Sequence, residues 1–361
     1  MKVKYAGLVL LGVLILTFAV SCKSAPPPEV VPPPPEKEVL DEASLKALEA
    51  AEDRALAAQK LISDFNGNTA FPDDWKSATA LLAEADRRKT TSTNQEIKDS
   101  TERYINAAKA FEGMTGKTME RYYGIREAAL VSARNEAVAA GADELIPEFL
   151  GNADAKTASA VKKYEAADYY GARAEADNAL TMYGLLKSGL EAYDIRYALA
   201  ERNFEEYDPV NIAKADDTLR DAANAYTAGD FKTTKEKIEA AKAAYTESTK
   251  IAWLSFAAEK GAEAADGRQM ALNERANVAS RQEFNAAQDM FNRANAAFRD
   301  QRFNEAASGF EESIKRFEAV VIATRLKRAA AEQALEKANQ KMAESDEKAR
   351  SAEIILEGGE E

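Results

Sequence analysis

Apolar residues recur along most of this chain at intervals of three, four and seven positions. This spacing places them on one face of an α-helix, with polar residues on the other face. A clear series is Phe303, Phe310 and Phe317, which are separated mainly by polar and small residues. The pattern predicts an all-α protein built from amphipathic helices.

Three isolated prolines mark the start of an internal repeat. Pro72, Pro147 and Pro209 open similar stretches, and Arg281 holds the equivalent position in a fourth. Proline is tolerated in the first turn of a helix because its missing N–H has no partner there. Each start is followed by one apolar residue and two alanines at constant offsets: Trp75, Ala78, Ala85; Leu150, Ala153, Ala160; Ile212, Ala215, Ala222; Phe284, Ala287, Ala294. We expect a helix to begin near each start.

The downstream half of each repeat predicts a turn and a second helix. A step of five breaks the helical register, and two steps of seven restore it. Ala228–Asp230 and Arg299–Gln301 hold residues suited to the turns, and the second helix of the third repeat is expected to run from about Phe231 to Glu259. The residues that follow these steps are Tyr164, Tyr169, Ala176, Tyr183; Tyr226, Phe231, Ile238, Tyr245; Phe298, Phe303, Phe310, Phe317; and, for the two sevens alone, Ile97, Tyr104, Phe111.

The repeat predicts an elongated array of helical hairpins, a solenoid or a bundle, in which alanines allow close helix approach and aromatic rings fill the gaps. We place a helical repeat domain at residues 38–320 and an extended C-terminal helix with a frayed tail at 321–361. The repeats themselves are expected near residues 72–140, 147–207, 209–266 and 281–320.

The last helix continues past the final repeat. Ala331, Leu335, Ala338, Met342 and Ser345 step by four and three, which is the seam of a coiled coil made with small residues. Such a helix is able to cap the array, to dimerise or to contact a partner. We favour capping.

The N-terminus has the layout of a bacterial lipoprotein signal. Lys2 and Lys4 precede an uncharged apolar run at residues 6–20, which is short for a transmembrane helix. The only cysteine, Cys22, follows this run after Ser21. We therefore expect a signal peptide at residues 1–21, cleavage between Ser21 and Cys22, and acylation of Cys22. The alternative is an ordinary secretory signal with a chance cysteine.

A proline-rich segment follows the cysteine. Residues 22–37 form the predicted linker, in which seven of the ten prolines of the chain lie. Polyproline segments are stiff, at about 3.1 Å per residue, so this linker spans roughly 45 Å. A plain spacer is favoured over a ligand for a proline-recognising domain.

Charge and composition exclude several classes of function. The net charge of −13 opposes nucleic-acid binding, which rests on cationic contacts to phosphate. The chain has no histidine, and Cys22 is assigned to lipid, so zinc, thiol and histidine-based chemistry are not expected. We predict no enzyme, cofactor or metal. A hydrolase of envelope glycans that uses two carboxylates is a third, weak option.

Trp253 is the one weak candidate for a partner-binding residue. It lies at 251–256, the most apolar stretch after the signal, and would be notable if exposed. Burial in the core is the favoured interpretation for this residue, and also for Trp75 and the aromatic stripe.

Two resemblances add to these predictions. The segments 225–241 and 297–314 resemble tetratricopeptide hairpins, although the repeat spacing here is much longer than in that family. The whole chain resembles spirochaete envelope lipoproteins of the treponemal membrane protein A type, in its relaxed lipid signal, its Ala- and Glu-rich body and its tail at 322–350. The second resemblance implies an antigenic, membrane-anchored envelope protein without known catalysis.

We expect a lipid-anchored scaffold or adaptor that presents its repeat surface to another envelope protein. The alternative is a periplasmic binding protein for a small or lipidic ligand that serves a transporter. Its location would be the periplasmic side of the envelope. Lys23 slightly favours the outer membrane, because it is not the Asp that retains lipoproteins at the inner membrane of enterobacteria.

Overall fold

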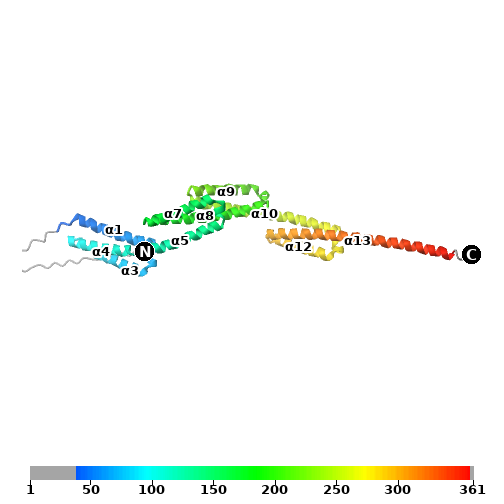
Figure 1. Cartoon of the computed structure of the whole chain (residues 1–361), viewed down its shortest axis with the longest axis horizontal. Helices are drawn as coiled ribbons and strands as arrows, with labels where there is room; N and C mark the ends of the chain where they lie inside the picture. The colour runs from blue at the N-terminus through cyan, green and yellow to red at the C-terminus, as the bar shows by residue number, and fades with distance from the viewer. Residues whose placement is uncertain (1–37, 358–361) are drawn as a thin grey trace, which may run out of the picture. The chain divides into compact units, whose positions relative to one another are not determined.

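A computed structural model describes residues 38–357, and all of its regular structure is helical (Figure 1). The predicted signal peptide, the cleavage site at Ser21 and Cys22, and the linker lie outside the described residues. The helices are α1 (Glu42–Asp64), α2 (Gly67–Ala70), α3 (Pro72–Arg87), α4 (Asn94–Glu112), α5 (Thr115–Ala139), α6 (Ala142–Leu145), α7 (Pro147–Glu165), α8 (Tyr169–Glu201), η1 (Phe204–Tyr207, a 3₁₀-helix), α9 (Pro209–Thr227), α10 (Phe231–Asn273), α11 (Ala276–Ala279), α12 (Arg281–Arg299) and α13 (Phe303–Glu357). The all-α prediction is confirmed.

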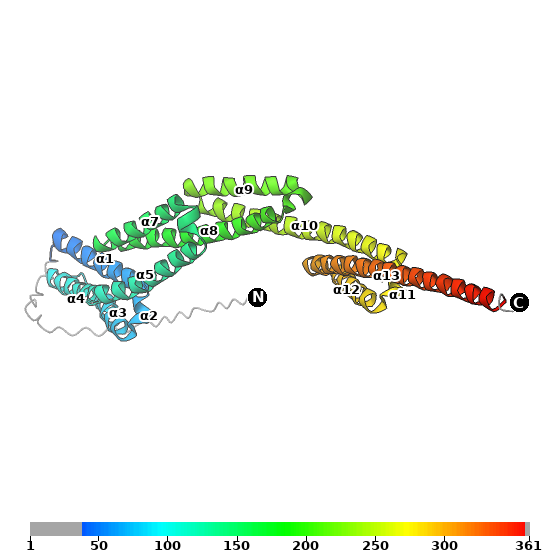
Figure 2. The same ribbon diagram turned by 45° about the vertical axis from the view of Figure 1, so that its right-hand side comes forward.

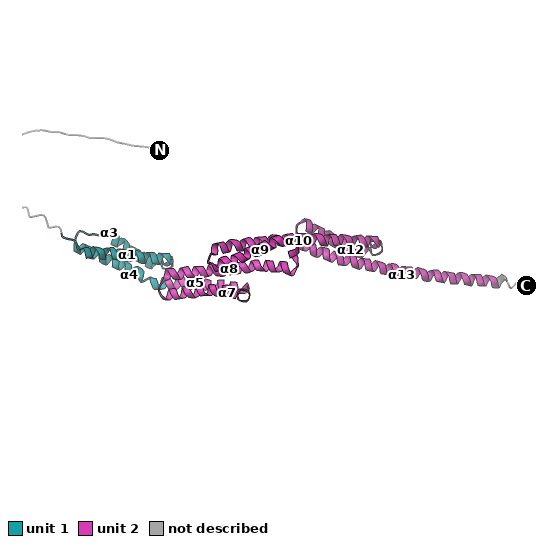
Figure 3. Cartoon of the chain, turned by 90° about the horizontal axis from the view of Figure 1, so that it is seen from above, with its two compact units in different colours: residues 1–118 teal, residues 119–361 magenta. Residues whose placement is uncertain are grey.

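The chain forms two compact units, divided between Thr118 and Met119 within α5 (Figure 3). In the first unit α4 packs against both α1 and α3. The core of this unit includes Ile62, Ile97 and Phe111, none of which is exposed. The sequence analysis did not identify α1 as a separate helix.

The predicted helix starts are confirmed. Pro72, Pro147 and Pro209 are the first residues of α3, α7 and α9, and Arg281 is the first residue of α12. A four-residue helix, which the apolar repeat did not predict, precedes each start. Each of these short helices follows a residue with left-handed backbone geometry. These residues are Asn66, Gly141, Asn203 and Arg275. They reverse the chain before each hairpin.

The predicted turns are also confirmed. Gly229 and Gln301 have positive φ angles at the ends of α9 and α12. Asp230 then caps α10 by accepting a hydrogen bond from the backbone N–H of Thr233. In the first copy the second helix is divided, because α4 ends at Glu112 and α5 begins at Thr115.

Each long helix of the second unit belongs to two hairpins. The helix α8 packs against α7 and against α10, and α10 packs against α9 and α8, and then against α12 and α13. The helix α10 therefore continues to Asn273, beyond both the predicted end at Glu259 and the predicted repeat boundary at 266. The repeat unit is therefore not an independent hairpin, because α8 and α10 each pack against helices of the following repeat as well as of their own.

The last helix crosses the boundary predicted between residues 320 and 321. It packs against α12 and α10 in its first part and then continues alone (Figure 2). Among the described residues, its last ion pairs with the body join Arg325 and Arg328 to Glu274. From Arg325 to Ile354 every side chain is exposed. The favoured interpretation, that this segment caps the array, is wrong for the described residues.

Candidate functional site: a groove between α8 and α9

A groove lies between α8 and α9, with α10 as its floor. We call it the α8–α9 groove. Its apolar half has a volume of about 270 Å³. Leu186 and Leu190 come from α8, Leu219 from α9 and Ile238 from α10. The groove forms because α8 and α9 both pack on α10, while few residues of α8 and α9 meet each other.

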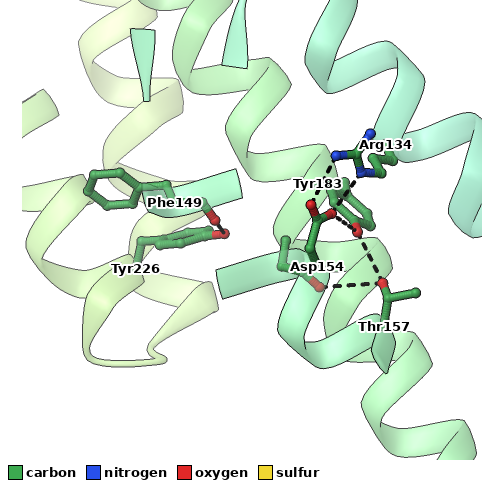
Figure 4. A network of polar contacts seen from close by, with 7 residues as sticks. Arg134, Phe149, Asp154, Thr157, Tyr183 and Tyr226 are labelled. Carbon is green, nitrogen blue, oxygen red and sulfur yellow. Dashed lines mark hydrogen bonds and ion pairs between the residues drawn. The ribbon is translucent and has the colours of Figure 1, made fainter. Parts of the chain in front are cut away.

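The short helix α6 and the start of α7 close one end of the groove. Leu145 and Phe149 line this end, and Leu145 is 53% exposed. The hydroxyl of Tyr226 donates a hydrogen bond to the backbone oxygen of Phe149 over 3.1 Å, and the centroids of the two rings lie 5.4 Å apart (Figure 4). These contacts fix α9 against α7 and therefore set the position of the closed end.

The other half of the groove is polar. It is lined by Arg196, Asp216, Arg220 and others, and Tyr193 and Leu219 line both halves. Arg196 forms an ion pair with Asp216, with 2.9 Å between Nε and Oδ1. The apolar part of the α8–α9 groove therefore adjoins a part with charged residues in its lining.

Two exposed tyrosines stand beside the junction of the two halves. Tyr193 and Tyr197 are one turn apart on α8, and their rings are stacked with centroids 6.3 Å apart. They are 42% and 53% exposed, respectively. Exposed aromatic residues next to an apolar groove are typical of binding surfaces, where tyrosine is enriched.

A polar cluster that is partly exposed to solvent joins α5, α7 and α8 (Figure 4). Arg134 of α5 binds both oxygens of Asp154 of α7, at 2.8 Å and 3.0 Å. Tyr183 of α8 donates its hydroxyl hydrogen to the same carboxylate over 2.6 Å. The hydrogen bond from Arg134 lowers the pKa of Asp154, and burial raises the pKa of Tyr183 to about 12. The cluster joins three helices, and we call it the Arg–Asp–Tyr triad.

The triad recurs in the next copy. Arg196 of α8 pairs with Asp216 of α9, and Tyr245 of α10 donates to Asp216 over 2.6 Å. In the fourth copy the equivalent residues are Arg268, Gln288 and Phe317. There Arg268 donates to the neutral Gln288 amide, and Phe317 has no hydroxyl. The apolar repeat did not predict this pattern, because polar positions are not part of it.

The fourth copy also shows why the groove is open in the third. Placing Pro209 on Arg281 aligns Leu219 with Phe291 and Ile238 with Phe310. The centroids of those two phenylalanine rings lie 5.8 Å apart. A Cβ added at Gly261 would come within 3.2 Å of the ring of Phe310. The junction of α10, α12 and α13 is thus filled at the positions that leave the α8–α9 groove open.

The equivalent glycine in α8 meets a smaller neighbour. Counting back from Asn203 and from Arg275 aligns Gly189 with Gly261. A Cβ at Gly189 would lie 3.7 Å from Cδ1 of Ile238, which is ordinary contact distance. The space at the floor of the groove therefore follows from the residue types at 219 and 238.

The predicted candidate residue is not part of this site. Trp253 is half-buried, with its ring 4.9 Å from Phe204 and 6.1 Å from Phe256, and the guanidinium of Arg202 lies over it. It packs η1 against α10 and is only partly buried, so it is not the fully buried core residue that we favoured. Trp75 is also half-buried, against Phe111.

No protein-family profile, curated protein or solved structure matches this chain. Within residues 38–357, acidic, histidine and cysteine side chains nowhere gather in a group of three or more that would suit a metal ion. Of the helices described, none is both long enough and apolar enough to cross a membrane.

Proposed function

We propose that this protein is a lipid-anchored, non-enzymatic adaptor of the bacterial envelope. Acylated Cys22 would hold it at the membrane, and the proline-rich linker would set its distance from the surface. The α8–α9 groove would bind a segment of another envelope protein. The observation that carries this proposal is the open apolar groove, at positions that the adjacent junction fills with phenylalanine.

The chemistry of the groove defines the segment that fits it. The apolar half suits two or three aliphatic or aromatic side chains, such as the anchors on one face of an amphipathic helix. Arg220 in the polar half suits a carboxylate, and its own partner Asp217 is an exposed neighbour on α9. Tyr193 and Tyr197 would cover the segment where the two halves meet.

A small lipidic molecule is the second candidate ligand. The apolar half of the groove is near the lower end of the usual size for small-molecule pockets, about 300–1,000 Å³. An acyl chain would contact Leu186, Leu190 and Leu219, and its polar head would reach Arg196 or Arg220. The same site thus serves either function, and the two must be separated by experiment.

Photo-crosslinking in intact cells tests both candidates. Tyr193 is replaced by p-benzoylphenylalanine in the full-length lipoprotein, and adducts are identified by mass spectrometry. The matched control carries the same label together with Leu219→Phe and Ile238→Phe, which copy Phe291 and Phe310 and fill the groove. Because these rings already pack in the adjacent junction, the control is expected to fold, which far-ultraviolet circular dichroism checks.

The outcomes are distinct. One dominant protein adduct that disappears in the groove-filled control supports the adaptor. A lipid adduct that disappears in the same control supports the second candidate. Adducts that are unchanged in the groove-filled control, or an absence of adducts, would contradict both uses of the groove. The release of the protein from membranes when Cys22 is replaced by Ser tests the anchor separately.

A further inference from the structure

The seam that builds the last hairpin continues into the isolated part of α13. The residues on this seam alternate in steps of four and three. In the hairpin they pack against α12 and α10, and Ala307, Phe310, Phe317 and Thr324 are at most 2% exposed. The series in full is Phe303, Ala307, Phe310, Ile314, Phe317, Val321, Thr324, Arg328, Ala331, Leu335, Ala338, Met342, Ser345, Ala349 and Ala352.

The continuation has no partner among the described residues. Leu335 and Met342 are each 64% exposed on this seam. Between Leu335 and Met342 the opposite face of the helix is polar and carries Glu336, Lys337 and Gln340. Apart from Arg328, which binds Glu274, the seam keeps the same register from the buried core into solvent. This indicates that the second part of α13 is also suited to pack against a helix.

The charges beside the seam determine which helix fits. In coiled-coil notation Leu335 and Met342 are a positions, and Ala338 and Ser345 are d positions. In a parallel pair each g residue lies opposite the e residue five positions later in the other chain. Lys341 would then face Asp346, and Lys348 would face Glu353. An antiparallel pair would instead place lysine near lysine and acid near acid.

The start of the seam is already occupied. Lys327, also a g position, contacts Ser280 and the backbone of Ala279 within its own chain. Arg328 binds Glu274. The free part of the seam therefore begins at Ala331.

We propose that residues 331–354 of α13 form a parallel, in-register, two-stranded coiled coil with the same segment of a second copy of this chain. Alanine and serine at most seam positions allow the two helices to approach closely but bury little apolar surface. The pair is therefore weak in dilute solution. Confinement of both copies to one membrane would raise their effective concentration and favour pairing.

Single cysteines placed in the full-length protein test this arrangement in native membranes. Leu335→Cys and Ala349→Cys are both at a positions, where a parallel, in-register pair brings each cysteine beside its own copy. Gln340→Cys, on the outer face, is the matched control. We expect an oxidised dimer for each of the two seam variants alone, and no more than the background of the unmodified protein for Gln340→Cys.

Charge reversal supplies the second measurement. Lys341→Glu and Lys348→Glu are added to the Leu335→Cys variant. They should lower the fraction of that variant that forms a crosslinked dimer by roughly tenfold, because four attractive ion pairs in the dimer become repulsive. Mixing this variant with one carrying Asp346→Lys and Glu353→Lys should restore it as a mixed dimer. Circular dichroism shows whether each variant keeps its helix content.

Several results would overturn the proposal. Crosslinking of a Leu335→Cys copy to an Ala352→Cys copy, without crosslinking of either variant to itself, would mean an antiparallel pair, in which a positions face d positions. An adduct of a different mass would mean another protein partner. Equal crosslinking at the control position, or no dimer at either seam position, would mean that the copies do not pair through this segment.

Discussion

Two equivalent junctions of the second unit solve the same packing problem differently. Where α8, α9 and α10 meet, Leu219 and Ile238 leave an apolar groove of about 270 Å³. Where α10, α12 and α13 meet, Phe291 and Phe310 occupy the aligned positions and pack together. The helix lengths, turns and alanines follow the same plan at both junctions. The turns and alanines therefore determine the helix array, whereas the side chains at 219 and 238, and at 291 and 310, determine whether a junction is open or filled.

The polar contacts of the two junctions differ in the same way. The triads built on Asp154 and Asp216 hold a charged carboxylate between an arginine and a tyrosine. The fourth copy replaces the acid by Gln288 and the tyrosine by Phe317. The filled junction thus has no ionisable acid or hydroxyl in its triad. The groove, which Asp216 and Tyr245 line, has both, and so does the junction of α5, α7 and α8.

The largest expected difference between the junctions is their response to alkali. Burial raises the pKa of Tyr183 to about 12, against an ordinary value of 10.0, and it also raises the pKa values of Tyr226 and Tyr245. Above pH 10 the unfolded chain loses these protons and the folded chain keeps them. Their contribution to stability is therefore complete below pH 10 and is lost as the pH rises through the folded-state values, by up to about 1.4 kcal/mol per tyrosine and pH unit.

Thermal unfolding followed by circular dichroism, with tyrosinate absorbance recorded in parallel, measures this loss. The variant Tyr245→Phe copies Phe317 and should make the loss smaller, although it also removes one hydrogen bond. Equal alkaline sensitivity in the variant and the unmodified protein would show that the buried tyrosines do not control it.

The second prediction concerns a variant in which the filled junction is opened. Phe291→Leu with Phe310→Ile copies Leu219 and Ile238, and removes two rings from a core that has no other change to compensate. We expect the free energy of unfolding to fall by roughly 2–4 kcal/mol. Urea denaturation measures it, and hydrogen exchange should place the loss of protection in α12 and the first part of α13.

The reverse variant of the α8–α9 groove, Leu219→Phe with Ile238→Phe, is the control. It fills space and should change stability by less than the opening variant does. If both double variants lower the free energy of unfolding by the same amount, the groove has no free space for the two phenylalanine rings and is not an open site.

The sequence predicted most of the fold and little of the site. Offsets from Pro147 and Pro209 located helix starts and turns, because apolar spacing and proline geometry act locally. The short helices before each start were missed, since four residues are too few to show a period. The α8–α9 groove was missed because it depends on the size of two side chains, Leu219 and Ile238, from helices distant in sequence.

The interpretation of α13 shows the same limit. Periodicity predicted a coiled-coil seam at Ala331–Ser345, and the structure shows that this stretch is helical, but periodicity alone does not say what covers a seam. Capping was favoured, and the described residues show the segment exposed instead. Charge at the e and g positions, which the apolar pattern does not include, carries the information on the partner.

The smallest expected effect comes from neutralising one triad. Asp154→Asn keeps the shape of the side chain but removes the negative charge that Arg134 and Tyr183 share, so the free energy of unfolding should fall by about 1–3 kcal/mol. Hydrogen exchange should show the loss in α7 and α8. The matched change Gln288→Leu removes a neutral acceptor from the equivalent position and should cost less.

Because Arg134 lowers the pKa of Asp154, the unmodified protein should lose this contribution as the pH falls through the lowered value, and the Asn variant should not. If the two variants lose equal stability, with the same dependence on acid, then the charge in the triad adds nothing to the junctions beside the groove, and the contrast with the fourth copy is one of packing alone.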